Sequence, residues 1–252
     1  MAESRSVVKL CGVAGVSLLA LTTAAFAGGS LKDEPAPERE LTYSFTLTGT
    51  SDYVFRGISQ SDNEPAIQGS ANIGYGIFYA GIWMSSVDFK DDAQIEADYY
   101  AGIKPTWGPA TFDFGVLYYD YPGYSDLVDN EYLELKASVS GEILKNLTAT
   151  GTLYYHPDYN GREYLVYEGG LAYALPKTWI FDPSLSGQVG HYDWDHGGTD
   201  YTYWNAGLSL AVDKLTFDFR YWDSEFDTTD CPMTTVSACD EKFVFSATLA
   251  LP

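Results

Sequence analysis

Residues 131–155 show the pattern that organises the rest of the chain. Apolar and polar residues alternate strictly from Tyr132 to Ser140 and, after a polar link at 141–146, again from Leu147 to Tyr155. Successive side chains of a strand point to opposite faces, so each segment predicts a strand with one apolar and one polar surface. Two such strands joined by a short link predict an antiparallel hairpin, which needs further strands around it to be stable.

The same alternation recurs along the chain and predicts about twelve strands. An even number of strands suits a closed single-chain barrel. The expected strands cover residues 41–55, 67–75, 78–85, 95–104, 112–119, 132–140, 147–155, 165–175, a segment ending near 192, 203–210, 215–222 and 243–251.

The connections between these strands alternate between short and long. In an up-and-down barrel successive links lie at opposite ends, so one end receives every long loop, as in outer-membrane barrels. A Greek-key sandwich gives no reason for this alternation. The sequence therefore predicts an all-β, antiparallel up-and-down transmembrane β-barrel. Short links lie at Gly76, Thr106, Gly141, Pro176 and Asp213, and longer, mostly acidic ones at 57–65, 86–94, 122–130, 157–162, 193–200 and 223–241.

Tyrosine and tryptophan gather where the expected strands enter the long loops. Amphipathic rings favour a membrane–water boundary, which predicts an aromatic girdle at that end. The alternative is that these residues are simply good strand formers. Trp107 and Trp179, near short links, are candidates for the opposite girdle. The clusters are Tyr53/Phe55, Tyr118/Tyr119/Tyr121, Tyr154/Tyr155, Tyr192/Trp194 and Tyr221/Trp222.

The first 27 residues have the features of a secretory signal peptide. Arg5 and Lys9 precede an apolar run at 10–21, and an A-x-A cleavage site ends at Ala27. A short membrane anchor that is never cleaved is the alternative. Residues 28–40 are rich in proline and charge and predict a flexible tail. We therefore expect export to the outer membrane and a single barrel domain over residues 41–252.

The composition is acidic, with a formal net charge of −21 in 252 residues. Phosphate binding needs a basic face, so this charge argues against DNA or RNA as a partner. It suits cations or the solvation of exposed loops, and charge alone does not choose between them. Beyond the N-terminus no run of about 20 apolar residues predicts a transmembrane helix.

The segment Ser51–Asp62 (SDYVFRGISQSD), followed by Pro65–Gln68, is not explained by alternation. It resembles the signature of the TorF-type porin family, a group of outer-membrane barrels also described as conserved hypothetical proteins. Further blocks follow in the same order at 78–83 with 87–89, at 96–102 and at 118–122. The resemblance covers essentially the whole chain after the signal peptide and implies an exported outer-membrane β-barrel.

If the apolar faces meet lipid, the polar faces line the lumen. A wet acidic lumen would favour cations. The alternative is a plugged barrel, held by Glu–Lys and Asp–Arg contacts across neighbouring strands. The candidate lumen-lining residues are Glu96, Asp98, Asp113, Glu134, Lys136, Glu168, Asp218 and Arg220.

Three further residues stand out in the long loops. Arg56 is a candidate to anchor the first loop or to constrict the mouth, anchoring being the simpler role. Cys231 and Cys239 remain after export and share the longest loop. An even cysteine count in an oxidising compartment favours a disulfide over a metal site.

No motif predicts a catalytic, cofactor or metal site. The segment His191–His196 has ligand types for a divalent cation but no fixed geometry, so a solvated loop is the simpler interpretation. Residues 158–161 share part of a calcium-loop pattern without its closing Glu. His156, His191 and His196 show no spacing that joins them to a nucleophilic serine.

We therefore expect a porin-like channel for passive diffusion of small solutes, with a preference for cations. The alternative from another class is a closed structural or surface-interaction barrel acting through its acidic loops. A barrel enzyme acting on lipid would need a hydrogen-bonded Ser, His and acid. A soluble exported barrel would need the opposite registration of its faces. The expected partners are outer-membrane lipid and small solutes or cations, and the oligomeric state stays open.

Overall fold

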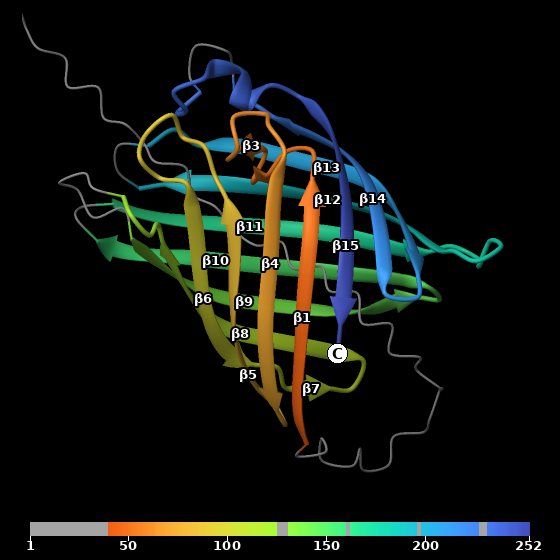
Figure 1. Ribbon diagram of the computed structural model, residues 1–252. Helices are drawn as coiled ribbons and strands as arrows, with labels where there is room; N and C mark the ends of the chain where they lie inside the picture. The colour runs from red at the N-terminus through yellow and green to blue at the C-terminus, as the bar shows by residue number, and fades with distance from the viewer. Residues whose placement is uncertain (1–39, 125–130, 160–161, 196–197, 227–230) are drawn as a thin grey trace, which may run out of the picture.

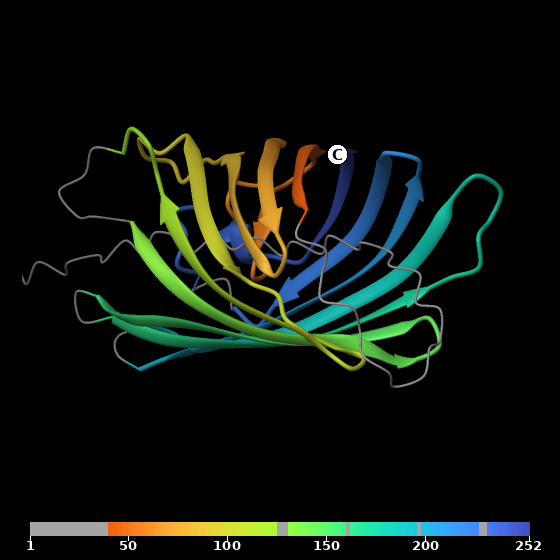
Figure 2. The same ribbon diagram turned by 90° about the horizontal axis from the view of Figure 1, so that it is seen from below.

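Twelve long antiparallel strands close into one barrel (Figures 1 and 2). The computed structural model describes residues 40–124, 131–159, 162–195, 198–226 and 231–252. The expected signal peptide and, except for Glu40, the expected tail lie outside the described residues. The long strands are β1 (Leu41–Thr50), β4 (Ala66–Tyr75), β5 (Phe78–Ser86), β6 (Ile95–Ile103), β8 (Ala110–Asp120), β9 (Tyr132–Leu144), β10 (Leu147–Tyr159), β11 (Arg162–Ala174), β12 (Asp182–Trp194), β13 (Tyr201–Val212), β14 (Leu215–Ser224) and β15 (Lys242–Leu251).

Each long strand pairs with the strands before and after it in the chain, and β1 pairs with β15 to close the ring. In the closing pair Leu47 lies opposite Leu249 and Thr48 opposite Thr248, so the apolar and polar faces of the two strands match. Two-residue β7 (Thr106–Trp107) extends the link before β8, and the 3₁₀ turn η1 (Val236–Cys239) lies in the loop before β15. The predicted fold class, a closed antiparallel barrel of twelve strands, is confirmed.

The apolar faces of the strands point away from the barrel interior. Leu47 is 57% exposed and Ile67 is 69% exposed, although both lie within paired strands. Their neighbours Thr48 and Gln68 face inward. None of the helical segments within the described ranges is long and apolar enough to cross a membrane.

The strand ends differ from expectation at three links. Strand β10 runs through Tyr159 and β11 starts at Arg162, so the expected long loop at 157–162 is short. The register shifts between His156 and Tyr159, an irregularity that accommodates Pro157 within the strand. Strand β9 extends to Leu144, which leaves a link of 145–146, whereas the link expected to be short at Pro176 spans 175–181. The predicted strict alternation of long and short links was therefore wrong at 157–162 and at Pro176, whereas the link at 141–146 is short, as predicted.

The largest difference concerns the first loop. Strand β1 ends at Thr50, not at residue 55, and the chain then turns into the barrel as the small hairpin of β2 (Val54–Phe55) and β3 (Ile58–Ser59). We call residues 52–61 the plug. Its turn is made by Arg56 and Gly57, both with positive φ (46° and 84°). A Cβ atom at residue 57 would lie 2.8 Å from Cβ of Tyr203, so glycine lets the plug approach the wall.

The aromatic residues at the strand ends divide between the two faces. Tyr118 and Tyr155 are each 36% exposed on the outside, whereas Tyr119 and Tyr154 are buried inside the barrel. Tyr53 and Phe55 are both buried in the plug, so only some residues of the expected clusters are available for an outer girdle. Figure 1 shows the loop with η1 at the barrel end that also carries the plug hairpin.

Candidate functional site

The buried ion pair of Arg56 and Glu134 fixes the plug to the barrel wall. The two terminal nitrogens of Arg56 donate to the two carboxylate oxygens of Glu134 at 2.8 and 3.0 Å. Tyr119 donates to Oε2 and Tyr164 to Oε1, at 2.8 and 2.9 Å. The side chains of the pair are only 1% and 0% exposed. A bidentate pair with further hydrogen bonds is the arrangement that makes burial of two charges tolerable.

Aromatic rings surround the guanidinium group of Arg56. Its central carbon lies 4.7 Å from the ring centroid of Tyr154 and 5.3 Å from that of Tyr192. Burial alone would lower the pKa of Arg56, but the charge of Glu134 raises it well above its usual value. Arg56 is therefore charged, and cation–π attraction to the wall tyrosines stabilises it further.

Hydrogen bonds within the first loop keep the plug compact. Ser59 donates to a carboxylate oxygen of Asp52 at 2.6 Å, and the backbone N–H of Tyr53 donates to Ser61 at 3.0 Å. Burial raises the pKa of Asp52, although its partner serines and Lys242 work in the opposite direction. The plug is thus a folded unit with its own polar interior.

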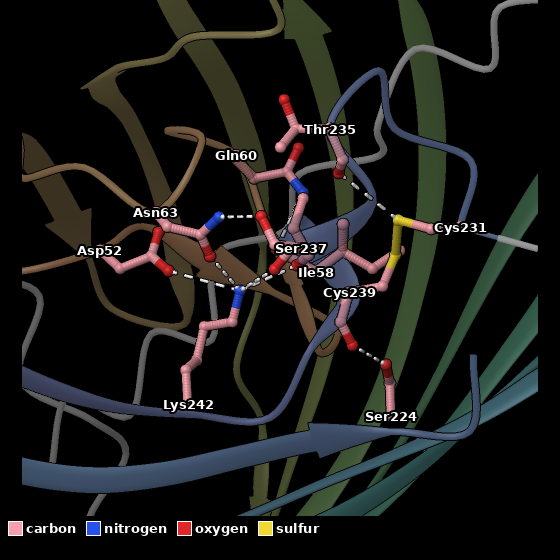
Figure 3. The surroundings of a disulfide bond; sticks show 11 residues. Asp52, Ile58, Gln60, Asn63, Ser224, Cys231, Thr235, Ser237, Cys239 and Lys242 are labelled. Carbon is pink, nitrogen blue, oxygen red and sulfur yellow. Dashed lines mark hydrogen bonds and ion pairs between the residues drawn. A yellow bond between two sulfur atoms is a disulfide. The ribbon is translucent and has the colours of Figure 1, made fainter. Parts of the chain in front are cut away.

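A second set of contacts, which we call the latch, joins the first loop to the last one (Figure 3). Lys242 donates to Asn63 at 2.6 Å and to the backbone oxygen of Ala238 at 2.9 Å, and its Nζ lies 3.6 Å from Asp52. Cys231 and Cys239, the pair expected from the sequence, form a disulfide in this loop. The disulfide holds the loop segment that supplies the carbonyl oxygen to Lys242.

Two further ion pairs line the wall beyond the plug. Asp113 accepts from Lys136 at 2.9 Å and from Tyr79 at 2.6 Å. Asp218 contacts Arg220 at 3.0 Å on the same strand. Both pairs are partly exposed, unlike the pair at the plug.

Arg220 also links three strands, and Glu168 bonds to the neighbouring wall. Arg220 donates to Asn205 at 2.6 Å and to Ser186 at 2.9 Å. Glu168 accepts from Tyr203 at 2.5 Å. The ring of Tyr203 lies over Gly190, where a Cβ atom would come within 2.3 Å of it. A small residue there gives the tyrosine the space it needs to reach Glu168.

The interior changes character along the barrel axis. At the level of the plug, Tyr119, Glu134, Val166 and Tyr203 are fully buried. Toward the end with β7 the inward side chains are mostly polar and partly exposed, and we call this half the vestibule. Its wall includes Thr48, Asn72, Ser138, Thr150, Ser186, Gln188, Ser209, Ser246 and Thr248.

Glu96 and Asp98, the remaining candidates, lie side by side on the inward face of β6 and are 0% exposed. Tyr53 of the plug approaches Glu96 at 3.4 Å. All eight candidate lumen residues thus face the interior, but they divide into two wall pairs, the plug anchor Glu134, Glu168 bonded to Tyr203, and this acidic pair. The plug residues around Arg56 were not among the candidates, and the break in alternation at 51–62 was the signal for them.

The described histidines have hydrogen-bond partners other than serine. His156 Nδ1 lies 2.7 Å from the backbone oxygen of Leu133, and His191 Nδ1 lies 3.0 Å from Thr202 Oγ1. His196 lies outside the described residues. Within the described ranges no three His, Cys, Asp or Glu residues group closely enough to hold a metal ion.

A comparison with protein families identifies the family of this chain. A family model described as "Bacterial protein of unknown function (Gcw_chp)" matches residues 32–250. The chain belongs to this family. Among curated proteins no sequence matches.

Solved structures similar to this Gcw_chp member are outer-membrane proteins. The NanC porin is 12% identical, with a TM-score of 0.50 over 82% of this chain and 97% of that chain. LpxR from Salmonella typhimurium is 10% identical, with a TM-score of 0.42 over 82% and 99% of the two chains. A loop deletion mutant of OmpT, an outer membrane protein of Vibrio cholerae, is 9% identical, with a TM-score of 0.42 over 84% and 99%. At these identities the likeness concerns the fold.

Proposed function

We propose that this protein is an outer-membrane channel for small polar solutes, with a preference for cations, in which the plug controls passage. The observation that carries the proposal is that the polar vestibule ends at a plug formed by one loop. Large wall side chains fixed on strands would fill a barrel permanently, whereas a loop segment is able to leave as a unit. The likeness of residues 51–62 to TorF-type porins supports the same role.

The outer surface supports a membrane location. Large apolar side chains remain exposed around the barrel, including Leu47, Ile67, Leu153 and Leu171. An exposed apolar band of this kind is what the lipid-facing surface of an outer-membrane barrel requires. Trp107 and Trp179, 81% and 83% exposed near the vestibule end, suit the membrane boundary there.

The charges at the plug support a preference for cations. Arg56 comes from the plug, whereas Glu134 and Glu168 come from strands of the wall. Departure of the plug would remove the positive charge and leave the carboxylates facing the lumen. A ring of acidic side chains favours the passage of cations over anions.

The test is conductance of the refolded protein in a planar bilayer with a salt gradient across it. A variant in which a short Gly-Ser link replaces residues 52–61 should show larger, more frequent current steps than the wild type, with a reversal potential on the cation side. A variant changed only in the 145–146 turn is the control. Heat-modifiable migration in gels checks that each barrel has folded.

One observation favours a second function, a closed barrel that acts through its surface loops. The Arg56–Glu134 pair is entirely buried, and Tyr119 and Tyr164 also donate to the carboxylate of Glu134. If the plug-replaced variant folds, inserts and still carries no current, the channel proposal is wrong. The acidic loops would then be the place to look for binding partners.

A further inference from the structure

The buried pair Glu96 and Asp98 has an unbalanced charge. Both side chains are 0% exposed, and they share the inward face of β6 two residues apart. Neither carboxylate oxygen of Asp98 accepts a hydrogen bond from an N–H or O–H group of the described residues, and Oε2 of Glu96 accepts none either. A buried carboxylate without a donor or a counter-charge is costly.

The neighbouring charges do not offset this cost. The charged groups that act on Asp98 are Glu96 and Glu134, both acidic. Glu134 is already neutralised by Arg56, whose two terminal nitrogens are both engaged with it. Tyr53 donates a long hydrogen bond to Glu96, and the side chain of Asp98 lies within hydrogen-bonding reach of Glu96. Two carboxylates therefore remain to be balanced by something the side chains do not supply.

The residues around the pair are closed to solvent. Across the strands Asp98 lies opposite Trp83 on β5 and Tyr119 on β8, and Glu96 lies opposite Ser85. These neighbours are themselves buried, so bulk water does not reach the pair. Carboxylate oxygens are the ligands that hard cations prefer.

We propose that Glu96 and Asp98 form a binding site for a hard cation of the Ca²⁺ type on the wall beneath the plug. The oxygens of the two carboxylates coordinate the ion, and its charge balances theirs. Because Tyr53 of the plug contacts Glu96, an ion here also stabilises the closed position of the plug. The site does not depend on conduction, so it goes beyond the proposed channel and is tested without measuring current.

Tb³⁺ luminescence tests the site directly, because Tb³⁺ replaces Ca²⁺ and emits when nearby aromatic rings are excited. The full chain after signal-peptide removal is refolded in detergent with Tb³⁺, and the emission is titrated with Ca²⁺. Trp83, opposite Asp98, is the expected sensitiser. We expect strong emission from the wild type that Ca²⁺ suppresses, and Asp193→Asn, in an exposed position, should leave it unchanged.

The variants Glu96→Gln and Asp98→Asn should each weaken Tb³⁺ binding by at least about tenfold, because each removes a charged ligand. Should a variant fail to fold, Trp83→Phe keeps both ligands and should reduce the emission while leaving the Ca²⁺ competition curve in place. Equal Tb³⁺ binding by the wild type and the acidic-pair variants would overturn the proposal. So would the absence of sensitised emission from the wild type, since the two carboxyl groups would then hold a shared proton only.

Discussion

The change Glu134→Gln asks whether one ion pair holds the plug in place. It removes the negative charge and nearly preserves the size of the side chain. The carboxylate accepts four hydrogen bonds, from Arg56, Tyr119 and Tyr164. The amide has one acceptor oxygen, and its NH₂ group would face donors. Arg56 would remain charged in a site where it is 1% exposed.

The size of the effect follows from the burial of the pair. Removing one partner of a buried ion pair costs about 3–5 kcal/mol, because the other charge stays buried without compensation. Solvent screening does little to reduce this at exposures of 1% and 0%. If the plug relieves the cost by leaving the barrel, the ratio of closed to open molecules falls by about 10²- to 10⁴-fold.

Trypsin and conductance measure this shift independently. Trypsin cleaves after arginine, so the bond following Arg56 should be protected in the wild type and cut in Glu134→Gln, with the fragment identified by mass. Single-channel recordings should show longer open times. The matched control is Asp113→Asn, which breaks the partly exposed wall pair with Lys136 and leaves the plug contacts intact. Unchanged protection and unchanged current in a properly folded Glu134→Gln barrel would refute the reasoning.

A compensating change sharpens the same experiment. Arg56→Met combined with Glu134→Leu removes both charges together, which is often nearly neutral for a buried pair. The double variant should therefore resist trypsin and stay closed more than Glu134→Gln does. A double variant that opens as readily as the single one would mean that packing, and not the unpaired charge, decides the position of the plug.

Three further outcomes are expected. Replacing Cys231 and Cys239 by serine should destabilise the last loop by about 2.5 kcal/mol in the chain-entropy model, given the separation of eight residues, and limited proteolysis should show earlier cutting there. Burial raises the pKa of Asp52 above 3.8 in the folded protein, so the stability gained from its protonated form is complete below pH 3.8 and is lost as the pH rises through the raised pKa. In a plot of unfolding temperature against pH, Asp52→Asn should flatten this decline. Gly190→Ala should destabilise the barrel by about 1–3 kcal/mol in urea unfolding, since the added Cβ meets the ring of Tyr203, and a Gly151→Ala control, with open space around its Cβ, should cost less.

Alternation was enough to predict the barrel because it reports a local property. The side chain of each strand residue points in or out according to its position alone, so the polar face that carries Glu134 and Lys136 could be identified without knowing any partner. The same reasoning placed Asp113, Asp218 and Arg220 inside. It failed at strand ends such as Pro157, where pairing with the next strand extends β10 past a residue that usually interrupts one.

The composition of the segment 51–62 showed that this segment was unusual, but it did not show where the segment lies in the fold. Arg56 and Glu134 are 78 residues apart, and no local pattern joins a loop to a strand on another part of the wall. Only the closed ring brings β9, β10 and β12 around the hairpin, so that Tyr154 and Tyr192 flank the guanidinium group. The sequence by itself determined the number of strands, their two faces and the inward position of the charged residues. The tertiary structure decided that the first loop fills the barrel and that Glu96 and Asp98 are left without a counter-charge, because both depend on contacts between segments far apart in the chain.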